Sequence, residues 1–230
     1  MKGDKMKPGK FIVIDGTDGS GKKTQTDLLV ENLRNAGHEV AVEDFPQYGQ
    51  KSAGLVEEYL NGVYGTAKEL GPHVPSIFYA CDRFAAGFRI RENIKNGLIV
   101  VSNRYVTANM GHQGGKIASR AERNKFYKWL TDLEFGLFKI PKPDLNLILH
   151  MPAEVAQDLV GKKGHRAYID KKKLDMHEAD LGHLKAAEAV YLEISKKFKY
   201  PLIECYVDGK ILSREEVAEM VWKRVSKILK

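Results

Sequence analysis

Short apolar runs alternate with amphipathic stretches along most of the chain. The run KFIVID (10–15) is apolar and β-branched and ends at a glycine, which is typical of a buried parallel strand. Because helical patterns lie between this run and similar ones, we predict an α/β fold of three layers, with a five-stranded, mainly parallel sheet flanked by helices. The other predicted strands are 39–45, 98–105 (LIVVSNRY), 143–151 and 202–208.

Apolar residues three or four positions apart predict the helices. Leu29 and Leu33 belong to such a stripe, which predicts a helix over 22–36. In the last predicted helix, Ser213 and Glu216 have the spacing of a capping box. The remaining helices are predicted at 52–62, 75–97, 119–138, 153–160, 181–198 and 213–229.

Length and composition favour one globular domain over residues 1–230. The chain is 43% hydrophobic and 29% charged, which is ordinary for such a domain. A lysine- and glycine-rich stretch at about 161–175 lacks apolar periodicity and predicts a loop. No apolar run approaches the ~18 residues of a membrane span, and the basic start has no apolar core behind it. Cys81 and Cys205 lie in apolar contexts without metal or redox spacing, so we expect both to be reduced thiols in the core of a cytoplasmic protein.

The net charge of +7 has two candidate explanations, a nucleic-acid surface or a site for several phosphates. Basic residues gather near 162–173 and at the termini, without a basic stripe interleaved with aromatic residues. We therefore favour small polyphosphates and expect neither a nucleic-acid nor a membrane partner.

The stretch GTDGSGKKT (16–24) follows the first predicted strand and opens the first helix. Glycines let backbone N–H groups turn toward phosphate oxygens, and a helix N-terminus adds partial positive charge, so this stretch predicts a phosphate loop. The alternative is a strand-to-helix turn without a ligand. The residues are Gly16, Thr17, Asp18, Gly19, Ser20, Gly21, Lys22, Lys23 and Thr24.

Lys23 departs from the phosphate-loop pattern, which has Ser or Thr at this position to hold Mg²⁺. An ammonium group is only a donor and cannot bind a metal. Two alternatives remain open. The phosphates, nearby carboxylates and water hold Mg²⁺, or Thr24 supplies the hydroxyl from a position rotated by about 100°.

Several segments together resemble the thymidylate kinase family, which has the P-loop nucleoside-monophosphate kinase fold with a short lid. They cover roughly residues 10 to 200 in the family's order. The resemblance implies ATP and dTMP as substrates, Mg²⁺ with ATP, transfer of the γ-phosphoryl group to give dTDP and ADP, and a homodimer. The segments are FIVIDGTDGSGKKTQ, EDFPQY, FYACDRF, VVSNRYVTANMGHQGG, PKPDLNLILHMP and GHLKAAEAVYLEI.

The resemblance also implies roles for residues near the phosphates. Lys22 and the loop amides would hold the ATP phosphates, and Arg104 would bind the dTMP phosphate. Asp18 matches a loop carboxylate near the sugar and phosphates of the acceptor, and is a candidate metal ligand. Without the resemblance, the sequence favours a turn-stabilising role for Asp18 and a position at the surface for Arg104.

On the acceptor side, Tyr79 and Arg83 lie four residues apart and share a helix face. The resemblance implies that they stack on thymine and bind its edge, whereas the spacing alone favours a core tyrosine and a solvated arginine. Tyr105 matches an aromatic residue under the deoxyribose that excludes a 2′-hydroxyl, with core packing as the alternative. The other dTMP-binding candidates are Phe45, Asn109 and Gln113.

One subgroup of the family carries a catalytic arginine in the phosphate loop, at the position of Gly19. The resemblance therefore assigns this charge to the lid, where Arg166 is favoured over Lys162 and Lys163. The family's arginine after its FP motif is also missing, and Tyr48 and Lys51 follow instead.

Two changes affect the surroundings of the metal together, since Lys23 replaces a hydroxyl and Asn103 replaces a carboxylate. Our hypothesis is that Lys23 partly takes over the role of a cation beside the ATP phosphates. The alternatives to a dTMP kinase are a kinase for another deoxynucleotide and a degenerate nucleotide-binding protein with slow transfer.

Overall fold

The computed structural model describes residues 7–161 and 181–229, and its centre is a five-stranded parallel sheet. The order of the strands is β2-β3-β1-β4-β5, so the predicted α/β architecture is confirmed. Most of the predicted lid, with Lys162, Lys163 and Arg166, lies outside the described residues. The strands are β1 (Phe11–Gly16), β2 (Val40–Asp44), β3 (Ile99–Asn103), β4 (Leu145–His150) and β5 (Leu202–Glu204).

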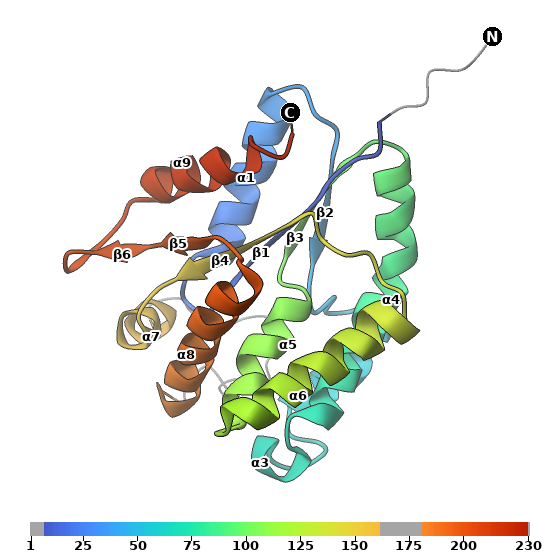
Figure 1. Ribbon diagram of the computed structural model, residues 1–230, viewed down its shortest axis with the longest axis vertical. Coiled ribbons are helices and arrows are strands. Elements are labelled where there is room, and N and C mark those ends of the chain that lie inside the picture. The colour runs from blue at the N-terminus through green and yellow to red at the C-terminus, as the bar shows by residue number, and fades with distance from the viewer. Residues whose placement is uncertain (1–6, 162–180, 230) are drawn as a thin grey trace.

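Helices cover both faces of the sheet (Figure 1). On β1, Ile12 and Ile14 join the core under α1 and α9, whereas Phe11 and Val13 join the core under α4, α5, α6 and α8. The helices are α1 (Lys22–Asn35), α2 (Gly54–Leu60), α3 (Ala67–Leu70), α4 (His73–Lys95), α5 (Val106–His112), α6 (Arg120–Thr131), α7 (Ala153–Gly161), α8 (Leu181–Phe198) and α9 (Arg214–Val225). In the described chain, no helix has the length and apolar character needed to cross a membrane.

The strand register brings the carboxyl ends of three strands together. Asn103, the last residue of β3, pairs with Ile14 of β1 and with Asp44 of β2. The loops that follow these strands therefore lie at one edge of the sheet, where ligands bind in open α/β folds.

Three sequence-based predictions need correction. The strand predicted at 202–208 ends at Glu204, because a turn at Asp208 and Gly209 returns the chain as the antiparallel hairpin β6 (Tyr206–Val207) and β7 (Lys210–Ile211). The helix predicted at 119–138 changes to a π-helix over Asp132–Leu137. The short helices α3 and α5 were not predicted at all.

Two smaller predictions are settled by the structure. The capping box of Ser213 and Glu216 is confirmed at the start of α9. Cys205 is buried as expected, but Cys81 is only half-buried, and both thiols are free.

Candidate active site

A cavity of about 420 Å³ opens at the carboxyl edge of the sheet. It brings together most of the predicted site residues. Gly16, Thr17, Ser20 and Tyr105 do not line it, and Arg166 lies outside the described residues. The lining residues are Asp18, Gly19, Gly21, Lys22, Lys23, Thr24, Asp44, Phe45, Pro46, Tyr48, Leu60, Tyr79, Arg83, Asn103, Arg104, Ala108, Asn109, His112 and Gln113.

The loop between β1 and α1 has a backbone that requires glycine. Gly19 has a φ of 82°, and a Cβ atom there would lie 2.4 Å from the carbonyl oxygen of Ala156 in α7. An arginine side chain at position 19 is therefore incompatible with this packing. Gly21, with a φ of 87°, is the N-cap residue of α1, and it lines the cavity together with Lys22, the first residue of that helix.

Two cations meet on the Asp18 carboxylate. Arg104 donates from Nη2 to Oδ1 of Asp18, and Lys22 Nζ lies 3.6 Å from the same oxygen. Lys22 Nζ also donates to the carbonyl oxygen of Thr17 at 2.8 Å. Both cations line the cavity and are held there by Asp18. Their presence argues against Asp18 as a metal ligand, a role that stays a prediction.

Arg104 has an unusual backbone at the end of β3. Its φ of 67° lies in the left-handed region, which residues other than glycine seldom adopt. Ser102 Oγ donates to the carbonyl oxygen of Arg104 at 2.7 Å, and the Arg104 amide donates to the carbonyl oxygen of Ile14 at 2.9 Å. Although burial opposes it, the Asp18 carboxylate raises the pKa of Arg104 well above its ordinary value.

Two histidines that sequence reasoning missed extend this cluster. His112 Nε2 lies 3.0 Å from Arg104 Nη1, and His112 Nδ1 lies 3.3 Å from His183 Nε2. Since a guanidinium only donates, His112 accepts at Nε2 and donates from Nδ1. Burial lowers the pKa of His112 well below its ordinary value, so the ring is neutral. The GHQGG segment carries no spacing that would identify this contact in advance.

Asp44 and Asn103 form a polar pair where β2 and β3 end. Asn103 Nδ2 donates to Asp44 Oδ1 at 2.8 Å. Asn103 Oδ1 is buried and has no hydrogen-bond partner among the described residues. Burial raises the pKa of Asp44, against the opposing effects of Asn103, Arg104 and Lys23. The pair presents oxygen atoms of the type that Mg²⁺ prefers.

Lys23 is turned toward the outer side of α1. Its ammonium lies 2.5 Å from Asp27 Oδ1, and the side chain is 64% exposed although the residue lines the cavity. Across residues 7–161 and 181–229, no group of three or more His, Cys, Asp and Glu side chains has an arrangement suited to a metal.

We call the part of the cavity that the predicted base-binding residues line its base end, and the part that Lys22, Lys23 and Arg104 line its phosphate end. Phe45 and Tyr79 supply aromatic surface. Asn109 Nδ2 donates to the carbonyl oxygen of Ser76 at 3.2 Å. Gln113 Oε1 is buried without a partner in the described part of the chain. This end thus offers both stacking surface and an uncompensated acceptor.

Arg83 is not the solvated arginine that the helical spacing favoured. It is 1% exposed and forms two hydrogen bonds with Glu134 of the π-helix, at 2.8 Å and 2.6 Å. Burial raises the pKa of Glu134, and the Arg83 guanidinium opposes this rise. Glu134 was missed because its partner lies on α4, far away in the sequence.

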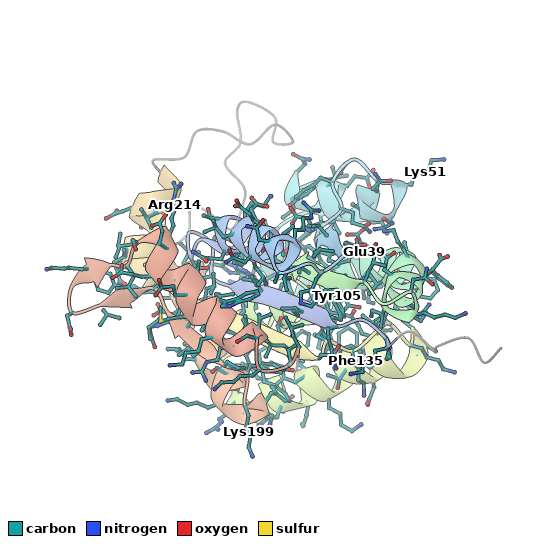
Figure 2. The ribbon with its side chains drawn as sticks, turned by 90° about the horizontal axis from the view of Figure 1, so that it is seen from above. Glu39, Lys51, Tyr105, Phe135, Lys199 and Arg214 are labelled. Atoms are coloured by element: carbon teal, nitrogen blue, oxygen red, sulfur yellow. The ribbon has the colours of Figure 1, made fainter. Side chains whose placement is uncertain are left out.

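Tyr105 lies in the core rather than at the cavity wall, and Figure 2 shows it at the centre of the molecule. Its ring centroid lies 4.9 Å from that of Phe11 and 5.6 Å from that of Phe45. Its hydroxyl donates to the carbonyl oxygen of Pro141 at 3.1 Å. These contacts agree with core packing, and a contact with a sugar stays a prediction.

The segment after Phe45 is held by a buried acid. Asp82 accepts from the Gln47 amide at 2.8 Å and from Ser52 Oγ at 2.6 Å. Of the two residues that follow the FP motif, Tyr48 lines the cavity, whereas Lys51 is exposed at the edge of the molecule (Figure 2). Tyr48 is therefore the better candidate for contacting an acceptor phosphate.

The sequence of this chain is similar to those of known proteins of one family. A model of the thymidylate kinase family matches residues 14–202. A thymidylate kinase of Mycobacterium tuberculosis (strain H37Rv) is 30% identical over 186 residues, covering 80% of this chain and 85% of that protein. The thymidylate kinase of Caulobacter vibrioides is 32% identical over 193 residues, covering 84% of this chain and 85% of that protein.

A solved structure of a thymidylate kinase from Candida albicans has the same fold. It superposes with a TM-score of 0.71 at 20% identity and covers 96% of this chain and 92% of that one. Together with the family match over most of the sequence, these findings show that the chain belongs to the thymidylate kinase family.

Proposed function

We propose that this protein transfers the γ-phosphoryl group of ATP to dTMP, giving dTDP and ADP. Besides family membership, one observation supports this proposal. Lys22 of the phosphate loop and Arg104 at the end of β3 both lie close to Asp18 in one cavity. This supports the proposal, because the cation that would hold the donor phosphates lies close to the cation that would bind the acceptor phosphate.

On the donor side, residues 16–24 would bind the ATP phosphates. The loop N–H groups and the N-terminus of α1 favour negative charge, and Lys22 supplies a full positive charge. In the transfer, an oxygen of the dTMP phosphate bonds to the γ-phosphorus while the bond to the β,γ-bridging oxygen breaks. The electron pair of that bond leaves with ADP. The acceptor oxygen is already ionised near neutral pH, so positioning and charge neutralisation carry the reaction.

Mg²⁺ would enter with ATP and neutralise charge on its phosphates. Asp44 and Asn103 fit as protein ligands or as partners of its water molecules, because the Asn103 amide oxygen is buried without a partner in the described chain. Asp18 fits less well, since Arg104 and Lys22 already occupy it. Arg166 stays the predicted lid residue that adds charge near the transferred group.

On the acceptor side, Arg104 would bind the dTMP phosphate with Tyr48 nearby. Tyr79 and Phe45 would pack on the nucleoside, and Arg83, Asn109 and Gln113 would contact the base. Tyr105 would act from behind Phe45, on whose ring it packs.

The test is a phosphoryl-acceptor assay with Mg-ATP and dTMP, dUMP, dCMP or thymidine, followed by single-turnover transfer with the best acceptor. We expect dTMP to give the highest kcat/KM. A higher value for another acceptor would reassign the substrate. Tight dTMP binding without dTDP in the single-turnover experiment would indicate a degenerate nucleotide-binding protein.

We also propose a homodimer that covers an apolar face of α4. Phe88 is 59% exposed, and its ring lies 5.4 Å from that of Phe84. Phe84 in turn lies 5.1 Å from Phe138, next to Leu137, which is 72% exposed. An exposed apolar patch of this kind indicates a contact surface. Sedimentation equilibrium of the wild type and of Phe88→Glu tests this, with a monomeric wild type as the contradicting result.

A further inference from the structure

The base end of the cavity is backed by a buried ion pair. Arg83 of α4 and Glu134 of the π-helix are 1% and 0% exposed. Arg83 Nε donates to Glu134 Oε2 at 2.8 Å, and Nη2 donates to Oε1 at 2.6 Å. Two parallel hydrogen bonds between charged groups fix the plane of the guanidinium as well as its place.

Stability does not by itself explain this pair. Removing two charges from water offsets much of their attraction, and apolar residues of similar volume are often at least as stabilising. Glu134 also lies in the π-helix Asp132–Leu137, a backbone form that is rare and frequent at functional sites. Arg83 lines the cavity in front of Glu134, so the pair connects the wall of the site to this segment.

We propose that Glu134 is a positioning residue: it orients Arg83 so that the cavity selects a pyrimidine with a carbonyl group at position 4. This inference rests on the proposed function, because it concerns the acceptor of that reaction. Glu134 acts through Arg83 and does not itself contact the substrate.

The hydrogen-bonding capacity of Arg83 explains the selectivity. A guanidinium has only N–H donors. Glu134 accepts hydrogen bonds from Nε and Nη2 of Arg83. The carbonyl oxygen of Tyr105 accepts from Nη1 at 3.4 Å. One N–H group on Nη1 and one on Nη2 remain, and because Arg83 lines the cavity, a ligand bound there would accept from them. A 4-carbonyl accepts from them, whereas the 4-amino group of cytosine places donor against donor and leaves polar groups unpaired.

The test compares Glu134→Gln with the matched control Glu193→Gln. Glu193 accepts from Arg123 at 2.7 Å, with both side chains mostly buried and neither lining the cavity. For Glu134→Gln we expect the KM for dTMP to rise about tenfold or more, with the KM for ATP unchanged. The preference for dTMP over dCMP should fall by about tenfold. Glu134→Asp, which keeps the carboxylate, should recover part of both losses, and Glu193→Gln should change neither.

An unchanged dTMP KM and an unchanged preference in folded Glu134→Gln overturn the inference. If that variant does not fold, Arg83→Met/Glu134→Leu replaces the pair by apolar side chains. It should fold, bind ATP normally and bind dTMP weakly, and wild-type dTMP affinity in it overturns the inference. If the wild type does not phosphorylate dTMP, the proposed function fails instead, and calorimetric binding of dTMP and dCMP to the same variants still tests Glu134.

Discussion

Two arginines line the same cavity and each pairs with a carboxylate, but their surroundings differ. Arg83 is enclosed, and Glu134 holds it with two hydrogen bonds in the protein interior. Arg104 stands on a left-handed backbone and shares Asp18 with Lys22, while His112 accepts from its other side. One arginine is fixed mainly by a single carboxylate, and the other belongs to a cluster of charges.

The difference matches what each end of the cavity is proposed to do. Recognition of a base needs a donor in one fixed orientation, because selectivity arises from unpaired groups in the wrong complex. Phosphoryl transfer needs positive charge gathered where negative charge develops. Substitutions at the base end should therefore change both the stability of the protein and its selectivity for the acceptor. Substitutions at the phosphate end should lower the rate of transfer with little effect on stability.

The largest expected effect is on the rate at the phosphate end. Arg104→Met should lower kcat/KM for dTMP about 10²–10³-fold, because a charge that neutralises the transferring phosphates is removed. Steady-state kinetics with saturating Mg-ATP measure it. Arg89→Met is the control, since Arg89 pairs with Glu43 outside the cavity and is mostly exposed. A loss of less than about tenfold would contradict the role of Arg104.

The next effect is on stability at the base end. Arg83→Met should lower the free energy of unfolding by about 3–5 kcal/mol, because it leaves the Glu134 carboxylate buried without its cation. Arg104→Met should cost clearly less, since Asp18 keeps Lys22 nearby. Denaturant unfolding of both variants under the same conditions gives the comparison. Equal losses would show that the two arginines do not differ as proposed.

A smaller effect concerns the metal side of the phosphate end. Lys23→Ser with Asn103→Asp should lower the Mg²⁺ concentration needed for half-maximal transfer roughly tenfold, because it adds a hydroxyl and a carboxylate beside Asp44. Magnesium titrations of each single variant and of the double variant measure the change. An unchanged requirement in the double variant would refute the hypothesis that Lys23 partly replaces a cation.

The features of the site that could be predicted from the sequence are those that depend on residues close together in the chain. The strand run at 10–15 and the glycine spacing after it predict the phosphate loop, because both signals are local. Glu134 and His112 could not be found in this way. Glu134 meets Arg83 across 51 positions through a π-helix that the apolar spacing does not reveal. His112 meets Arg104 only because α5 follows directly after β3.

The strand predicted at 202–208 shows the same limit. Its apolar residues suit one continuous strand. However, the chain turns back at Asp208 and Gly209, and the second half therefore pairs with β7 rather than with the main sheet. Tyr105 is similar, since a tyrosine after a strand suits both a pocket wall and a core. Its packing against Phe11 and Phe45 shows that it lies in the core, and the sequence does not reveal this packing.

The smallest expected effect lies away from both ends of the cavity, at His150 on β4. His150 Nε2 lies 2.9 Å from Glu188 and Nδ1 lies 2.5 Å from Glu204, and Glu188 also accepts from the Ala153 amide at 2.9 Å. Although burial opposes it, these two carboxylates raise the pKa of His150 in the folded state. The stabilisation is therefore fully present below the unfolded pKa of about 6.5 and is lost as the pH rises through the folded value.

His150→Gln should accordingly reduce the free energy of unfolding by up to about 1 kcal/mol below pH 6 and by less at pH 9. Urea unfolding of wild type and variant at both pH values measures this difference. Because His150 does not line the cavity, kcat and the preference for dTMP over dCMP should stay at wild-type values. A change in either would mean that charge pairs outside the cavity also affect catalysis, and the contrast between its two arginines would then no longer be specific to the site.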